Sequence, residues 1–248
     1  MRYFLDTVDT VPEGVGFSHF DMLHLGWLAL FAITVVVCCI WYRKMGTKGR
    51  KLWKKTVALL IVLDEVFKMA MLFVGNRYTL GYLPLHLCSI NIFIITFHAW
   101  KPTKTVGSFL YTVCIPGALA ALLFPSWADL PIVNFMHIHS FTVHILLALY
   151  PIVLTASGEI EVKIKAVPKC LLLLLGMAIP IYIFNMIFDT NFMFLMRADE
   201  GNPLKFFEQL WGNHLLGFPV IITAIILVLY VPVELYRIVN KRKEQLPV

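Results

Sequence analysis

A run of polar side chains interrupts an otherwise apolar stretch at residues 84–91, Pro-Leu-His-Leu-Cys-Ser-Ile-Asn. The run holds a histidine, His86, and a thiol, Cys88. A thiol becomes a nucleophile when a base removes its proton, and histidine is the most common general base. Crossing a bilayer requires none of these groups, so their presence in an apolar segment indicates a functional site.

Helical spacing decides which of these groups can act together. Residues two apart lie about 200° from each other in a regular helix, so His86 is badly placed to deprotonate Cys88. Asn91 is on the same face as Cys88. We expect the base to come from another segment and to be His144. The alternative is that Cys88 is a small buried side chain with no chemical role.

A second polar group lies in Leu-Asp-Glu-Val-Phe-Lys at residues 63–68. Asp64 and Glu65 precede Lys68 by four and three residues, so either carboxylate can neutralise the ammonium group on one helix face. Such a pair has lost much of its hydration and needs further partners from other helices or water. It either holds the helices together or helps to orient a histidine or bind a lipid headgroup.

Other apolar stretches carry polar side chains near one of their ends. His137 and His144 share a helical face at a spacing of seven, whereas His139 points elsewhere. The remaining members of the group are Asp21, His24, Asn185, Asp189 and Asn191. We expect these side chains to meet in one hydrated pocket that opens toward the outer leaflet.

The elements that position these residues follow from composition. The chain is 59% hydrophobic and 15% charged, and it has too much apolar surface for one soluble core. Its apolar stretches are continuous, which favours spanning helices over alternating barrel strands. We predict an all-α polytopic membrane protein, a single seven-helix domain over residues 1–248. The helices are expected near residues 20–42, 56–75, 84–100, 105–125, 137–155, 168–188 and 215–236, with an outer re-entrant or lid segment at 189–214.

The distribution of Lys and Arg predicts the orientation. Sixteen of the 21 lie in residues 43–55, 101–104, 163–169 and 237–243, which a seven-helix topology places on one side. The positive-inside rule then puts the N-terminus outside and the C-terminus in the cytoplasm. The net charge of +6 is accounted for by this topology and by attraction to anionic headgroups, so we expect no nucleic-acid partner.

Four segments resemble a known family. They are Leu-Asp-Glu-Val-Phe-Lys at 63–68, Leu-Pro-Leu-His-Leu-Cys-Ser at 83–89, His-Ile-Leu-Leu-Ala-Leu-Tyr-Pro at 144–151 and Asp-Thr-Asn-Phe-Met-Phe-Leu at 189–195. Together and in this order they are similar to the YwaF branch of bacterial integral membrane proteins, which is related to the animal transmembrane protein 164 (TMEM164) family. The resemblance covers nearly the whole chain.

The resemblance implies an acyltransferase that moves a polyunsaturated acyl chain from a diacyl phospholipid to an ether lysophospholipid, using a cysteine and a histidine. His144 matches the histidine of the family's fifth-helix motif, and His86 matches the histidine that follows the helix-three proline. The family cysteine lies between that proline and that histidine, where this chain has Leu85. Here Cys88 follows the histidine instead.

We therefore expect an enzyme of the bacterial cytoplasmic membrane that moves a fatty acyl chain between phospholipid and lysophospholipid, with no cofactor and no metal. The predicted catalytic residues are Cys88, His144 and His86. The predicted substrate-binding residues are Asn91, Asn191, Glu65, Lys68, Asn185 and Asp189. The sequence gives no indication of an oligomeric state.

Two other classes of protein are compatible with the same residues. In a proton-coupled transporter or a receptor, Asp64, Glu65 and Lys68 would carry the charge within the membrane. In a metal-dependent lipid hydrolase, His86, His137, His144 and a carboxylate of the second helix would bind zinc or iron. A third possibility keeps acyl transfer but omits the covalent step, and a histidine then acts directly on the acceptor hydroxyl.

Overall fold

A computed structural model describes residues 2–198 and 202–244, with side chains up to residue 238. Every regular element in this part of the chain is helical, and six helical segments are long and apolar enough to cross a membrane. They are Met22–Lys44, Leu80–Trp100, Lys104–Leu123, Phe135–Ala156, Ile164–Phe188 and His214–Ile238. The prediction of an all-helical, multi-pass membrane protein is therefore confirmed.

The longer helices are α1 (Met22–Lys44), α2 (Thr47–Val74), α3 (Leu87–Trp100), α6 (Phe135–Ala156), α7 (Val167–Phe188) and α9 (Gly217–Glu244). Between α3 and α6, the chain forms α4 (Lys104–Phe109), a π-helical turn, η2 (Leu110–Cys114), and α5 (Ile115–Leu123). Pro116 has no N–H to donate to the carbonyl of Thr112, which gives a reason for the widened turn at this point. The short elements are η1 (Leu80–Tyr82), η3 (Ile164–Ala166), η4 (Phe192–Phe194), α8 (Pro203–Trp211) and η5 (His214–Leu216).

The helix α6 is the centre of the fold. Of its 22 residues, 15 are buried, and α1, α2, α3 and α5 pack against it. In contrast, α1 buries only His24 and Tyr42 and exposes apolar side chains such as Ile33 and Val36. So much exposed apolar surface suits contact with lipid rather than with water.

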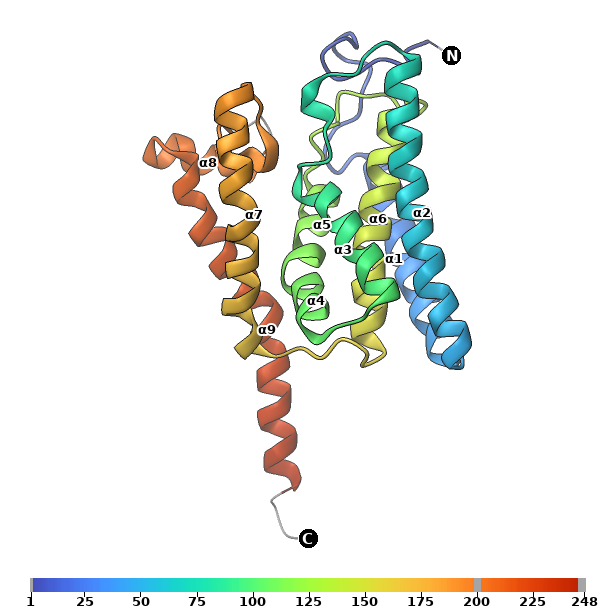
Figure 1. Cartoon of the computed structure of the whole chain (residues 1–248), viewed down its shortest axis with the longest axis vertical. Coiled ribbons are helices and arrows are strands. Elements are labelled where there is room, and N and C mark those ends of the chain that lie inside the picture. Colours follow the sequence, from blue (N-terminus) through green and yellow to red (C-terminus); the bar gives the residue numbers. More distant parts are fainter. Residues whose placement is uncertain (1, 199–201, 245–248) are drawn as a thin grey trace.

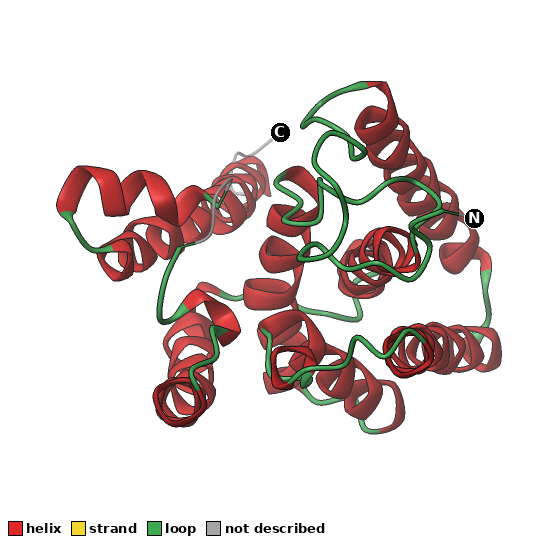
Figure 2. Ribbon diagram, turned by 90° about the horizontal axis from the view of Figure 1, so that it is seen from above, coloured by secondary structure: helices red, strands yellow, loops and turns green. Residues whose placement is uncertain are grey.

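The helices fall into two groups (Figures 1 and 2), with α1 to α6 on one side and α7, α8 and α9 on the other. The π-helical turn η2 joins them. Tyr111 donates a hydrogen bond from its hydroxyl to the carbonyl of Leu229 at 2.8 Å, and the hydroxyls of Thr112 and Tyr230 are 2.6 Å apart.

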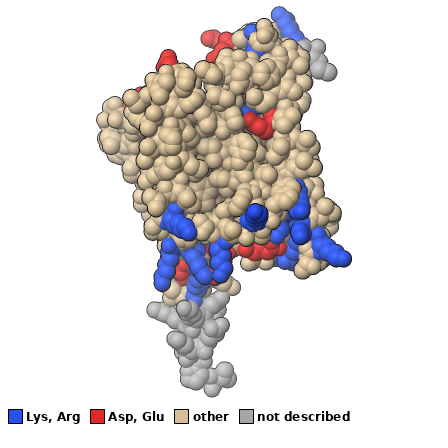
Figure 3. Space-filling model, in the orientation of Figure 1, with Lys and Arg blue, Asp and Glu red and all other residues tan. Residues whose placement is uncertain are grey.

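Charge is also divided along the long axis. On the face drawn in Figure 3, most Lys and Arg lie at the lower end, where α1 ends and α2 begins, and a broad uncharged band lies above them. Three of the cations that the sequence places at this end, Lys241, Arg242 and Lys243, have side chains outside the described part.

Two helix boundaries differ from the prediction in ways that affect the site. The helix α3 begins at Leu87 rather than at residue 84, and His86 is its extended N-cap residue. Pro84 disfavours helical geometry in the residue before it, and Leu83 accordingly has an extended ψ of 146°. The argument that His86 and Cys88 lie on opposite faces of one helix therefore does not apply. The helix α2 begins at Thr47, nine residues before the predicted start.

Candidate functional site

A cluster of four charged or titratable side chains joins α2 to α6. The Nδ1 atom of His139 lies 2.9 Å from Oδ2 of Asp64, and its Nε2 atom lies 3.8 Å from Oε2 of Glu65. The other oxygen of Glu65 accepts a hydrogen bond from the Lys68 ammonium at 2.5 Å. The pairing of Glu65 with Lys68 is one of the two that the spacing allows. Each side chain is 14% exposed or less, so this is a nearly buried ionic network.

The contact between Asp64 and His139 is close but poorly aligned. Neither Oδ2 of Asp64 nor Nδ1 of His139 has a hydrogen-bond partner of acceptable geometry among the described residues. At this distance the two atoms can share a hydrogen bond only if one of them carries a proton. The cluster therefore places an imidazole in direct contact with a carboxylate at the interface of α2 and α6.

Lys68 also connects this cluster to the three predicted catalytic residues. His86, Cys88 and His144 each lie close enough to its ammonium group for a Coulomb interaction. His144 is also within such reach of both His86 and His139. Groups from α3 and α6 thus lie within electrostatic range of one buried cation on α2.

His144 is held in a defined tautomer. Its Nδ1 atom lies 2.6 Å from the backbone carbonyl of Ser140. Because a carbonyl only accepts, Nδ1 must carry the proton, and in the neutral ring Nε2 is then an acceptor. The indole of Trp127 stacks on the imidazole with a centroid distance of 5.2 Å and an interplanar angle of 12°. His144 therefore has the fixed orientation and the free lone pair that a general base needs.

His86 is held in the opposite tautomer. Its Nδ1 atom accepts a long hydrogen bond, 3.4 Å, from the backbone N–H of Met193. In the neutral ring the proton is then on Nε2, which becomes a donor. The rings of Phe192 and Phe194 pack beside the imidazole at 5.0 and 5.9 Å. Such a donor can stabilise a developing oxyanion.

The loop that contacts His86 has a strained backbone. Met193 and Phe194 have φ angles of 58° and 54°, in the left-handed region that side chains other than glycine disfavour. Such a conformation costs roughly 1–3 kcal/mol per residue and is found most often at functional sites. Three predicted binding residues lie in or beside this loop.

Two of these three have amide side chains that build the loop. Asn185 accepts hydrogen bonds from the Thr190 hydroxyl and from the backbone N–H of Phe192, and it donates to the Phe192 carbonyl. Asn191 accepts from the backbone N–H groups of Met196 and Arg197. Asp189, the third, is exposed and caps α7 with a φ of 50°. The bonds of Asn185 thus position Phe192, which packs on His86, whereas those of Asn191 hold the turn that follows.

Cys88 and Asn91 line the first turns of α3. Cys88 is half-buried against the core cluster that includes Ile92 and Leu147. Asn91 is 2% exposed, and its Oδ1 atom has no hydrogen-bond partner in the part of the chain that is described. An unpaired buried amide group costs about 1–3 kcal/mol. A bound ligand or water with a hydrogen-bond donor would remove that cost.

Two other histidines of the predicted pocket, His24 and His137, make structural contacts. His24 accepts from the N–H of Phe20 and bonds to the carbonyl of Leu122, which joins α1 to α5. His137 bonds to the carbonyl of Leu130 and accepts from the indole N–H of Trp27, so both of its ring nitrogens are engaged. No three His, Cys, Asp or Glu side chains among the described residues are grouped as metal ligands. The set of His86, His137, His144 and a carboxylate is therefore not assembled.

Sequence reasoning missed His139 and Trp127. His139 was expected to point away from the site because it does not share a face with His144. His139 does lie on a different face of α6 from His144, and that face contacts Asp64 and Glu65 of α2. A histidine opposite a buried carboxylate pair can be recognised only once α2 is known to pack on α6. No signal in the sequence indicates that Trp127 stacks on His144.

Comparison with known proteins identifies the family of this chain. Searches of curated proteins and of solved structures found no significant match. The family model described as the TMEM164 family matches residues 16–230, which include every residue of the cluster around Lys68. Since this match covers most of the chain, the protein belongs to the TMEM164 family.

Proposed function

We propose that this protein is a lipid acyltransferase that moves a fatty acyl chain from a phospholipid to a lysophospholipid at the cluster around Lys68. The observation that carries the proposal is the opposite hydrogen bonding of the two histidines. His144 offers a lone pair and His86 offers a proton, and both lie near the same cation. Acyl transfer needs this combination of a base for the nucleophile and a donor for the oxyanion.

The proposal includes a seven-helix topology with the N-terminus outside and the C-terminus in the cytoplasm. The helix α2 would then also cross the membrane, which brings the number of spans to seven. With 28 residues it is about 42 Å long. Because of Asp64, Glu65 and Lys68, α2 is less apolar than the six helical segments given above. These charges contact one another and His139. In this orientation the cluster lies in the outer half of the membrane, and the segment 189–214 covers its outer side; residues 199–201 of that segment lie outside the described part.

The first half-reaction forms a thioester. The Nε2 atom of His144 takes the proton from Cys88, and the thiolate attacks the ester carbonyl carbon of a phospholipid. The Nε2–H group of His86 donates to the oxyanion, with the ammonium of Lys68 nearby. The carbon–oxygen bond then breaks, and the leaving lysophospholipid takes the proton from His144.

The second half-reaction reverses these roles. The hydroxyl of the acceptor lysophospholipid gives its proton to His144 and attacks the thioester carbonyl. The carbon–sulfur bond breaks, and the Cys88 thiolate recovers its proton from His144. Each cycle therefore consumes one phospholipid and one lysophospholipid and yields one of each, with no cofactor.

The test is acyl transfer by purified protein between an acyl-labelled phospholipid and an unlabelled lysophospholipid. We expect His144→Ala and Cys88→Ala to lower the rate by about 100-fold or more, a typical loss for an acid–base residue. The matched controls are His19→Ala, an exposed histidine at the same end, and Cys39→Ala, a half-buried thiol of α1. Equal rates in all five proteins would refute the site. A Cys88→Ser variant that keeps its rate would instead support direct attack by the acceptor hydroxyl.

A second candidate function, proton-coupled transport, is favoured by the nearly buried contact between Asp64 and His139. A titratable pair of side chains between two helices is a feature of proton-coupled carriers. Proteoliposomes with an internal pH dye distinguish the two functions. A pH change driven by a solute gradient, and abolished in Asp64→Asn, would support the transporter.

A further inference from the structure

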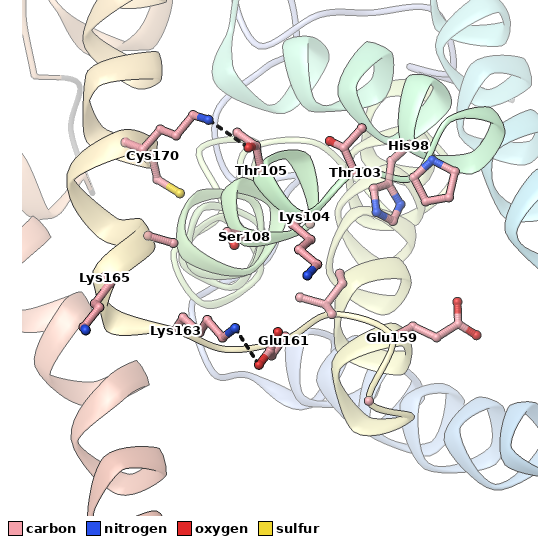
Figure 4. A pocket seen from close by; sticks show the side chains of 16 residues that line it. His98, Thr103, Lys104, Thr105, Ser108, Glu159, Glu161, Lys163, Lys165 and Cys170 are labelled. Carbon is pink, nitrogen blue, oxygen red and sulfur yellow. Dashed lines mark hydrogen bonds and ion pairs between the residues drawn. The ribbon is translucent and has the colours of Figure 1, made fainter.

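A second polar site lies at the other end of the bundle from the Lys68 cluster. An open cavity of about 610 Å³ is lined by the end of α3, the start of α4, the start of α7 and the loop at 157–166. Figure 4 shows its lining, in which side chains of Lys104, Ser108 and His98 approach from one wall and Glu161 and Lys163 from another. Its volume is in the range of small-molecule sites.

The lining carries an excess of positive charge. Its cations are Lys104, Lys163, Lys165 and Lys169, and its carboxylates are Glu159 and Glu161. Glu161 is paired with Lys163 at 2.8 Å. Lys104 lies within electrostatic range of Glu161, but neither Lys104 nor Lys165 takes part in a hydrogen bond or ion pair that the structure describes.

Glu159 does not offset this excess, because residues outside the cavity neutralise it. One of its oxygens accepts a hydrogen bond from Lys54 at 2.7 Å. The other accepts from the Tyr42 hydroxyl at 2.8 Å and lies 3.6 Å from the guanidinium of Arg50. Burial by itself raises the pKa of Glu159. The hydrogen bonds from Lys54 and Tyr42 and the nearby cations lower it by more, so the pKa is below its usual value.

A buried imidazole supplies a further polar atom. His98 is 5% exposed, and its Nδ1 atom lies 3.0 Å from the Tyr150 hydroxyl. The other ring nitrogen, Nε2, has no described hydrogen-bond partner. It faces Gly107, and a Cβ atom added to that glycine would lie 3.6 Å from Nε2. When the Tyr150 hydroxyl donates to Nδ1, the proton is on Nε2, which can then donate into the cavity. The hydroxyls of Thr103, Thr105 and Ser108 line the same space.

We infer that this cavity binds a phosphate group, carried either by a lipid headgroup or by a soluble phosphate ester. Two ammonium groups without a described ion pair, hydroxyl donors and, when Tyr150 donates to His98, an imidazole N–H suit a small anion with several acceptor oxygens. The cavity is large enough for a glycerophosphate unit as well as for the phosphate itself. This site shares no residue with the proposed acyl-transfer site and does not depend on it.

The test is binding of phosphate compounds to the full-length protein in a neutral detergent, measured by isothermal titration calorimetry. The probes are inorganic phosphate, glycerol 3-phosphate and dihexanoyl phosphatidic acid. The test variant, K104A/K165A, removes the two unpaired cations. The matched control, K48A/K51A, removes two exposed lysines of α2 at the same end of the bundle. Melting curves without phosphate check that both variants are folded.

We expect K104A/K165A to bind at least tenfold more weakly than the wild type, whereas K48A/K51A binds like the wild type. Binding of phosphatidic acid alone would identify a lipid headgroup site, and binding of glycerol 3-phosphate or inorganic phosphate as well would identify a site for soluble esters. Both results support the inference. It is overturned if no probe binds, or if K104A/K165A and the wild type have equal affinities.

Discussion

The Nδ1 atom of His139 lies 2.9 Å from Oδ2 of Asp64. This contact joins α6 to the ionic network of Asp64, Glu65 and Lys68 on α2. We expect Asp64→Asn and His139→Ala each to destabilise the protein by about 3 kcal/mol, because each leaves a nearly buried polar partner uncompensated. Melting temperatures in one detergent provide the measurement.

The double variant tests whether these losses have one cause. If Asp64 and His139 stabilise the fold through each other, D64N/H139A costs clearly less than the sum of the single variants. Strictly additive losses would mean that the contact contributes nothing by itself.

Asn91 is expected to separate stability from activity. Replacing it with Leu removes a buried amide oxygen that has no described partner, so Asn91→Leu should leave the melting temperature unchanged or raise it. If the amide binds the substrate, the same variant should transfer acyl chains about tenfold more slowly. Destabilisation of Asn91→Leu by more than about 1 kcal/mol would show that the amide is already satisfied in the unliganded protein.

Asp189 provides a test of backbone strain at the end of α7. It is exposed and has φ and ψ angles of 50° and 47°, where glycine is favoured. Asp189→Gly should therefore stabilise the protein by about 1 kcal/mol, and Asp189→Val should destabilise it by at least as much. Thermal melts give the stability, and the transfer assay shows in parallel whether the carboxylate also binds substrate. A loss of stability in Asp189→Gly would contradict the strain argument.

The lowered pKa of Glu159 predicts that the folded protein loses stability in acid. Its pKa is lower in the folded protein than the ordinary value of 4.5. The ionised carboxylate therefore stabilises the fold above that ordinary value, and this contribution disappears as the pH falls through the lower, folded pKa. The side chain is partly exposed, so we expect less than about 1 kcal/mol.

The measurement compares wild type with Glu159→Gln from pH 7 to pH 3. The wild type should melt at a higher temperature at pH 7, and the two curves should converge at the acid end. Glu13→Gln, which alters an exposed carboxylate near the N-terminus, is the matched control. A difference between wild type and Glu159→Gln that is constant over the whole pH range would rule out the ionic contribution.

The sequence alone predicted much of the fold. Long apolar stretches predict spanning helices because a lipid environment requires each backbone polar group to be bonded within its own segment. Most ends of the long helices agree with the structure within a few residues, but α2 begins nine residues early and α9 ends eight residues late. The single helix predicted at 105–125 is divided by the π-helical turn η2. The pairing of Glu65 with Lys68 was one of the two that their spacing allows, since contacts three or four residues apart are a local property of a helix.

Only the tertiary structure decided which helix faces meet. His139 and Asp64 are far apart in the chain, and nothing in either segment specifies the other as its partner. The same holds for Trp127 on His144 and for the loop backbone at Met193 that fixes the tautomer of His86. Periodicity in the sequence reports the angle of a side chain around its own helix axis, whereas a site depends on how several axes pack together.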